Sequence, residues 1–193
     1  MFLGLVLTAF GSAYYHLDPG DARLVWDRLP MTLVFMPLVS ALIAERVEVK
    51  LGLGLLPLLT AVGVLSVIHW HRTVLAGAAD VRFYGAVQLY AVLALLAASL
   101  LPARYSHGGD LLLAAGFYAL AKICEMADPQ IYSLGHIVSG HTLKHLAAAG
   151  AGFSIVGMLG RREPLATSMS SERDPSGHDR GHRPAPELPT VKR

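Results

Sequence analysis

The sequence contains a single cysteine, Cys124, among its 193 residues. A disulfide within the chain is therefore excluded, and so are a CxxC motif and a Cys/His zinc finger, because each needs at least two cysteines. Redox chemistry of paired thiols and thiolate zinc sites are thereby set aside.

Charged side chains are also scarce. They make up 16% of the chain, against about 25% in ordinary globular proteins, while 53% of the residues are hydrophobic. The last 33 residues hold 12 of the 30 charged side chains, so the first 160 residues are more apolar than the average indicates. The formal net charge of +2 is too small for a nucleic-acid-binding surface, so we expect no nucleic-acid partner. The balance is typical of a membrane protein.

Long apolar runs are what the sequence does contain. A helix needs about 20 residues to cross a bilayer, and six segments reach or approach this length. They cover residues 1–16, 29–44, 51–70, 83–101, 111–127 and 134–159. Short polar connections separate them, so neighbouring helices must run antiparallel. The sequence therefore predicts an all-α fold, a polytopic transmembrane helical bundle of six helices within a domain of residues 1–160.

The two ends of the chain need separate interpretations. Residues 1–16 begin at a methionine but lack a basic n-region and a cleavage site, so we expect a spanning helix rather than a signal peptide. Residues 161–193 are rich in Ser, Pro, Gly and charged side chains, which predicts a disordered polar tail. Lysines and arginines near the helix ends slightly favour the side that carries this tail. We therefore expect a multi-pass integral membrane protein with a cytoplasmic C-terminal tail, in the plasma or inner membrane if bacterial.

Ionisable side chains at the rim of membrane helices are costly and indicate functional sites. Ser12 and His16 lie four residues apart at the end of the first segment, and His141 and His145 have the same spacing in the last. That spacing puts both side chains on one helix face and lets two imidazoles bind one metal ion. Asp27 lies at the predicted start of the second segment, where a carboxylate could also simply cap the helix.

The alternation of helices places these groups on one side of the membrane. The first segment ends there, and the second and last segments begin there, so His16, His141 and His145 can meet at one site. Three neutral imidazoles leave the fourth position of a tetrahedral zinc ion open for water, as in catalytic zinc sites. Ser12 could instead ease helix packing or bond back to a helix carbonyl.

A further polar group ends the fifth segment on the same side. It consists of Lys122, Glu125 and Asp128. Lys122 and Glu125 lie three residues apart, so they can neutralise each other on one helix face.

The positions of these residues resemble the signature of the alkaline ceramidase family. Its wider superfamily also holds the adiponectin and progestin receptors. The stretches Gly-Ser-Ala-Tyr-Tyr-His at 11–16 and Trp-Asp-Arg-Leu-Pro-Met at 26–31 are similar to bacterial ceramidase-like members. The resemblance spans residues 1 to about 159 and implies a seven-helix family fold, of which this chain has six helices and lacks the first.

The resemblance implies a zinc-dependent integral-membrane amide hydrolase that acts on ceramide-like lipids and releases a fatty acid and a sphingoid base. It implies that His16, His141 and His145 bind Zn²⁺. It also implies that Asp27 holds and deprotonates the attacking water and that Ser12 stabilises the oxyanion. The acidic N-terminal segment that contributes a calcium site in the eukaryotic enzymes is absent, so we expect no such calcium site. The expected partners are the lipid bilayer and its lipid substrate, with no protein partner.

Three other functions compete with this interpretation. A lipid-sensing, receptor-like membrane protein would hold a structural zinc and show little turnover. A bis-histidine haem protein would need histidines on opposite sides of the haem plane, whereas histidines four residues apart on a helix point to one small centre. A transporter is disfavoured because the polar residues gather at one rim rather than along a path through the bundle.

Overall fold

The computed structural model describes residues 1–165, which form seven helices and no multi-residue strand. The helices are α1 (Phe2–Leu17), α2 (Asp21–Arg46), α3 (Val49–Leu75), α4 (Arg82–Leu100), α5 (Asp110–Met126), α6 (Asp128–Ser133) and α7 (Gly140–Arg161). The predicted all-α fold is confirmed, and the six predicted helices correspond to the six long ones. The predicted disordered tail lies, from residue 166 onward, outside the described residues.

Four of the helices, α2, α3, α4 and α7, are long and apolar enough to cross a membrane. With 16 and 17 residues, α1 and α5 are shorter. Large apolar side chains cover the outside of the bundle; Phe10 is 71% exposed and Phe153 is 76% exposed. A soluble protein rarely shows so wide an apolar exterior, so this surface fits a lipid environment.

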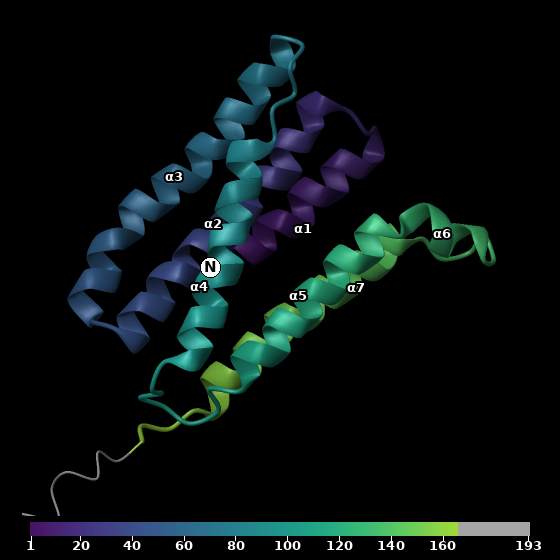
Figure 1. Ribbon diagram of the computed structural model, residues 1–193. Coiled ribbons are helices and arrows are strands. Elements are labelled where there is room, and N and C mark those ends of the chain that lie inside the picture. The colour runs from purple at the N-terminus through teal and green to yellow at the C-terminus, as the bar shows by residue number, and fades with distance from the viewer. Residues whose placement is uncertain (166–193) are drawn as a thin grey trace, which may run out of the picture.

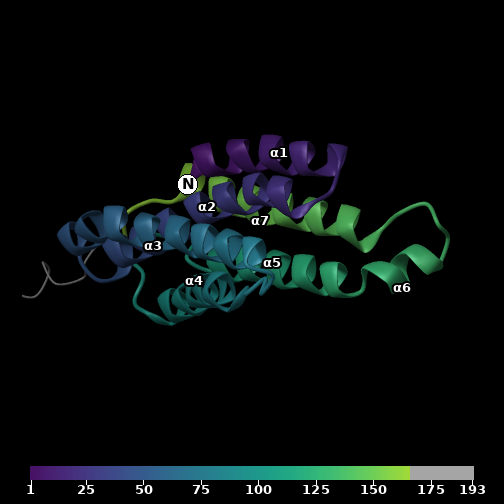
Figure 2. The same ribbon diagram turned by 90° about the horizontal axis from the view of Figure 1, so that it is seen from above.

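The helices form two groups. α2 lies between α1 and α3 and packs against both, whereas α5 and α7 form a separate pair (Figure 1). α4 packs against α2 and α3 and also contacts α5, so it connects the groups. Seen from above, α6 and the loop that follows it project beyond one end of the bundle (Figure 2).

Small buried clusters hold the bundle together. Met36 and Val39 of α2 pack with Val87 and Ala91 of α4 near the middle of the molecule. A second cluster joins α2, α4, α5 and α7 through Leu42, Leu95, Ala98, Leu111 and Met158. Toward the other end of α2, Trp70 of α3 packs with Tyr84 of α4. Burial of this apolar surface fixes the order of the helices.

Two glycines allow close helix contacts at that end of the bundle. A Cβ atom at Gly11 would overlap the carbonyl oxygen of Trp26, where α1 meets α2. A Cβ atom at Gly140 would overlap the carbonyl oxygen of Cys124, where α7 meets α5. Each glycine directly precedes a candidate site residue, so the same contacts that join the helices also position the site.

Two helix starts differ from the prediction. α2 begins at Asp21 rather than at residue 29, so the expected loop is mostly helix, with an acidic side chain in its first turn where the helix dipole favours it. α7 begins at Gly140 rather than at residue 134, because the Ser139 hydroxyl caps it by accepting a hydrogen bond from the Thr142 N–H. The short helix α6 occupies a segment that was expected to be a loop.

Ion pairs close the opposite end of the bundle. The buried Arg46 guanidinium donates to the Leu101 carbonyl at 3.2 Å and lies 3.4 Å from the Glu45 carboxylate. Arg162, which directly follows α7, also donates to Glu45. The end of α7 is thereby tied to the end of α2.

Candidate metal centre

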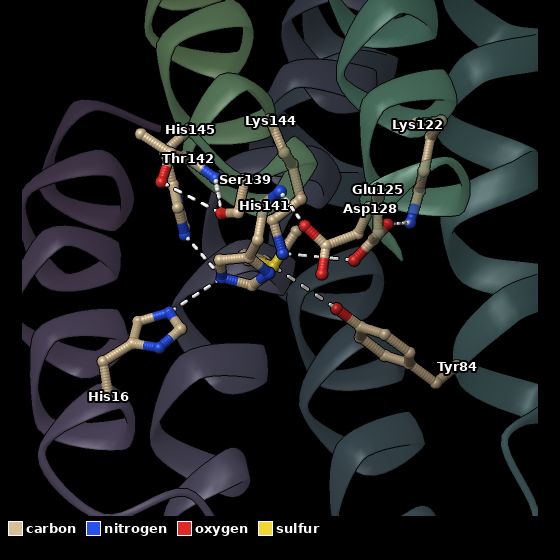
Figure 3. A network of polar contacts seen from close by, with 11 residues as sticks. His16, Tyr84, Lys122, Glu125, Asp128, Ser139, His141, Thr142, Lys144 and His145 are labelled. Atoms are coloured by element: carbon tan, nitrogen blue, oxygen red, sulfur yellow. Dashed lines mark hydrogen bonds and ion pairs between the residues drawn. The ribbon is translucent and has the colours of Figure 1, made fainter. Parts of the chain in front are cut away.

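Three histidines from two helices converge at one end of the bundle. His16 lies in the last turn of α1, and His141 and His145 lie in the first turns of α7. Nε2 of His141 lies 2.8 Å from Nε2 of His16 and 3.0 Å from Nε2 of His145. One ring nitrogen from each residue lies within 4.8 Å of the others, and Figure 3 shows a nitrogen of His16 and a nitrogen of His145 pointing toward the His141 ring. The structure thus brings together the three imidazoles that the helix alternation predicted to share one side.

The geometry of this cluster fits metal binding better than a hydrogen-bonded chain. An imidazole nitrogen carries either one hydrogen or one lone pair in the ring plane, so Nε2 of His141 cannot direct good hydrogen bonds to both neighbours. The His141 ring is inclined by 78° to that of His16 and by 72° to that of His145. Nitrogens bound to tetrahedral zinc lie about 2.0–2.1 Å from the ion and therefore roughly 3.3 Å apart, so a small displacement of the rings accommodates it.

Within residues 1–165 this is the one group of three or more His, Cys, Asp or Glu side chains whose ligand atoms lie close enough together to hold a metal ion. Hydrogen bonds at the start of α7 support it. The backbone N–H of His141 donates to the Asp128 carboxylate at 2.7 Å, and the Ser139 cap fixes the first turn. Asp128, which the sequence indicated as part of a polar group on this side, thereby orients the helix that carries two of the three imidazoles.

A cavity of about 510 Å³ lies beside the histidines. His141 and His145 line it together with Asp27, so the structure brings the predicted base to the predicted ligands. Asp27 lies in the second turn of α2, and the N-cap of that helix is Gly20. The alternative that Asp27 merely caps the helix is therefore wrong.

Ser12 lies one turn before His16 on α1 and is 7% exposed. Its hydroxyl has no hydrogen-bond partner in the part of the chain that the structure describes. Thr8, one turn earlier, donates to the Gly4 carbonyl at 2.8 Å. The alternative that Ser12 bonds back to a helix carbonyl is therefore wrong, whereas a packing role is compatible with the close helix contact at Gly11. Ser12 does not line the cavity.

The predicted pair of Lys122 and Glu125 forms, with 2.8 Å between Nζ and Oε2. A third member was not predicted from the sequence: Nζ of Lys144 donates to the other oxygen of Glu125 at 3.1 Å. All three side chains line the cavity. Figure 3 shows Lys122 and Lys144 pointing toward Glu125. The position of Lys144 between His141 and His145 could have indicated its presence at the site.

Arg28 is a second residue that sequence analysis did not place at the site. It lines the cavity, and its guanidinium lies 4.0 Å from the ring centroid of Trp70 and 5.1 Å from that of Tyr84. Its position directly after Asp27 was the available signal. The aromatic partners come from α3 and α4, and the sequence does not show that they approach it.

An apolar cavity of about 150 Å³ adjoins the polar one. It lies among α1, α2, α4, α5 and α7, and its lining is mostly aliphatic. The two cavities share the lining residues Thr8, Met31, Tyr118 and Ala148. The combined space suits an amphipathic ligand with an apolar chain and a polar group near the histidines.

Comparison with protein-family models, with curated proteins and with solved structures finds no match to this chain. What bears on its function is therefore the chemistry of the histidine cluster and the two cavities beside it.

Proposed function

We propose that the protein is a zinc-dependent, multi-pass membrane hydrolase that cleaves the amide bond of ceramide-like lipids and releases a fatty acid and a sphingoid base. The observation that supports this most is the convergence of three imidazoles beside a cavity that contains Asp27. Three protein ligands are the donor set of catalytic zinc, whereas structural zinc sites use four. The cluster offers three ligands among the described residues.

The donor set suits the ion. Imidazole nitrogen is a preferred zinc ligand, and His16, His141 and His145 can present one nitrogen each. Zinc supplies a Lewis acid that polarises a carbonyl and lowers the pKa of water. These properties are the ones that amide hydrolysis at neutral pH requires.

Two side chains would assist the reaction, one by transferring a proton and one by stabilising negative charge. Asp27, at the cavity wall, would hold the attacking water, accept its proton and pass that proton to the amide nitrogen as the C–N bond breaks and the amine leaves. Ser12 would donate its hydroxyl to the oxygen of the substrate carbonyl as negative charge develops there, and for this the buried side chain has to turn toward the cavity, which it does not line in the structure. The Ser12 hydroxyl has no internal partner in the described residues, so it does not have to give up a hydrogen bond for this role.

The cavities would place the two parts of a lipid differently. The acyl chain would lie in the apolar cavity among α1, α2, α4, α5 and α7, and the amide would lie in the polar cavity beside the imidazoles. A membrane-embedded bundle gives such a lipid direct access to the site.

We propose that the tail after α7 is cytoplasmic.

The direct test is release of fatty acid from a labelled ceramide by the full-length protein in detergent or nanodiscs. The proposal predicts release that stops when zinc is removed with a chelator and returns when zinc is restored. Binding of the lipid without release, with the protein folded and loaded with zinc, would contradict the hydrolase and would favour a lipid-sensing protein instead.

A further inference from the structure

Arg28 is held in place by two buried aromatic rings. Trp70 of α3 is 2% exposed and Tyr84 of α4 is 7% exposed, and the guanidinium lies over both rings. Stacking of arginine on aromatic faces is favourable and fixes the plane of the guanidinium. Residues from three helices thus hold the side chain at the wall of the polar cavity.

The guanidinium of Arg28 lacks a carboxylate partner. Within residues 1–165 it makes no hydrogen bond or ion pair, and its Nη1 atom is buried without a partner. Its other nitrogens are not enclosed in this way. Five other arginines do pair with carboxylates: Arg23, Arg46, Arg82, Arg161 and Arg162. One nitrogen of the guanidinium is thus withdrawn from water without an anion, and its other nitrogens can donate hydrogen bonds to a ligand in the cavity.

The charges around the cavity are consistent with an anionic ligand. The cationic side chains in its lining are Arg28, Lys122 and Lys144, and the carboxylates are Asp27 and Glu125. With neutral imidazoles the lining carries one excess positive charge, and a bound zinc ion would add two more. Glu125 is already paired with both lysines. A neutral ligand would leave the excess charge uncompensated.

We propose that Arg28 recognises an anionic group, a carboxylate or a phosphate, that lies close to the amide of the lipid substrate. Arginine binds both groups through two parallel N–H···O hydrogen bonds, which a neutral headgroup cannot match. Within the class of ceramide-like N-acyl lipids, the preferred substrates are then those with a negative charge beside the amide, and neutral ceramide is a weaker substrate. That such lipids are hydrolysed rests on the proposed function. That Arg28 binds their anionic group does not depend on hydrolysis.

Binding by the full-length wild-type protein in nanodiscs tests the inference without any substitution. Two pairs of lipids are compared: N-oleoyl glycine with N-oleoyl glycinamide, and ceramide 1-phosphate with ceramide. We expect the anionic member of at least one pair to bind about tenfold more tightly or better, and the pair that shows the difference identifies carboxylate or phosphate. Equal affinities within both pairs would overturn the inference.

Substitutions then test the residue. Arg28→Gln should abolish the preference, so that the ratio of the affinities for the anionic lipid and its neutral counterpart falls to about one, while Arg28→Lys should keep part of that ratio. Arg23→Gln is the matched control, because Arg23 also lies on α2 with its guanidinium 4.8 Å from an aromatic ring centroid, that of Tyr14, but does not line the cavity. An unchanged preference in folded Arg28→Gln protein would show that Arg28 is not the recognition group.

The two proposals can fail separately. Tight, Arg28-dependent binding of an anionic lipid without fatty acid release would support the inference and contradict the hydrolase. Release of fatty acid at equal rates from charged and neutral lipids, unaffected by Arg28→Gln, would support the hydrolase and overturn the inference.

Discussion

Asp27 and Glu125 both line the polar cavity, but their surroundings differ. Glu125 accepts hydrogen bonds from two lysines, so its charge is already compensated. Asp27 makes no ion pair or side-chain hydrogen bond with any described residue. Asp27 is therefore the cavity carboxylate that is available to accept a proton from water.

The Asp27→Asn substitution tests this role. The amide keeps the size of the side chain but cannot accept the proton, so fatty acid release should fall by roughly 10²–10⁴-fold. Zinc content and thermal stability should be unchanged. Asp18→Asn is the control, because that carboxylate is 78% exposed in the connection between α1 and α2. Full activity in the Asp27→Asn protein would exclude Asp27 as the base.

Ser12→Ala separates a catalytic hydroxyl from a packing residue. Because the hydroxyl has no internal partner in the described chain, its removal should leave thermal stability nearly unchanged. Loss of an oxyanion donor should lower the rate of amide cleavage by about 10²–10³-fold. Unchanged turnover would mean that Ser12 serves only the contact between α1 and α2.

At the scale of helices, apolar runs predicted the six long helices but not all of their ends. The criterion excluded residues 21–28 because they carry Asp21, Arg23, Asp27 and Arg28, yet these residues are helical. Two of these four charged side chains, Asp27 and Arg28, line the cavity. The charged residues that made this part of α2 look like a loop are therefore partly residues of the site. The apolar residues 134–139 were included but lie outside α7, since His136 has a positive φ of 55°.

The sequence likewise predicted only part of the candidate site. The sequence predicted that the three histidines share one side of the bundle, because helix alternation alone decides this. It could not predict that Lys144 reaches Glu125 or that Trp70 and Tyr84 enclose Arg28. Those contacts depend on the distances between helices, which side-chain packing sets.

Gly11→Ala tests whether the close contact between α1 and α2 positions His16. The new Cβ atom would overlap the Trp26 carbonyl oxygen, so α1 must move away. We expect a loss of about 1–3 kcal/mol of stability in thermal denaturation, together with weaker zinc binding. Gly54→Ala is the control, because a Cβ atom there meets nothing within 4 Å, and this helix position should be stabilised by about 0.5–1 kcal/mol. Equal thermal stability and equal zinc binding in the two variants would show that the contact between α1 and α2 does not position His16.

For the molecule as a whole, the site joins two groups of helices. α1 and α7 do not pack extensively, and they approach each other at the histidine cluster and where Leu5 lies against Gly152. Arg162 and Glu45 tie α7 to α2 at the opposite end. A metal ion held by His16 of one group and by His141 and His145 of the other would close the bundle at the end that contains the polar cavity.

The proposed reaction depends on zinc bound by His16, His141 and His145. Elemental analysis of the full-length protein purified in detergent should find about one zinc per chain in the wild type, the stoichiometry of a single three-histidine site. The same analysis should find almost none in a folded His141→Ala/His145→Ala protein. A folded wild-type protein that binds no zinc even when zinc is supplied, or a double variant that retains the metal, would show that the three histidines do not form a zinc site.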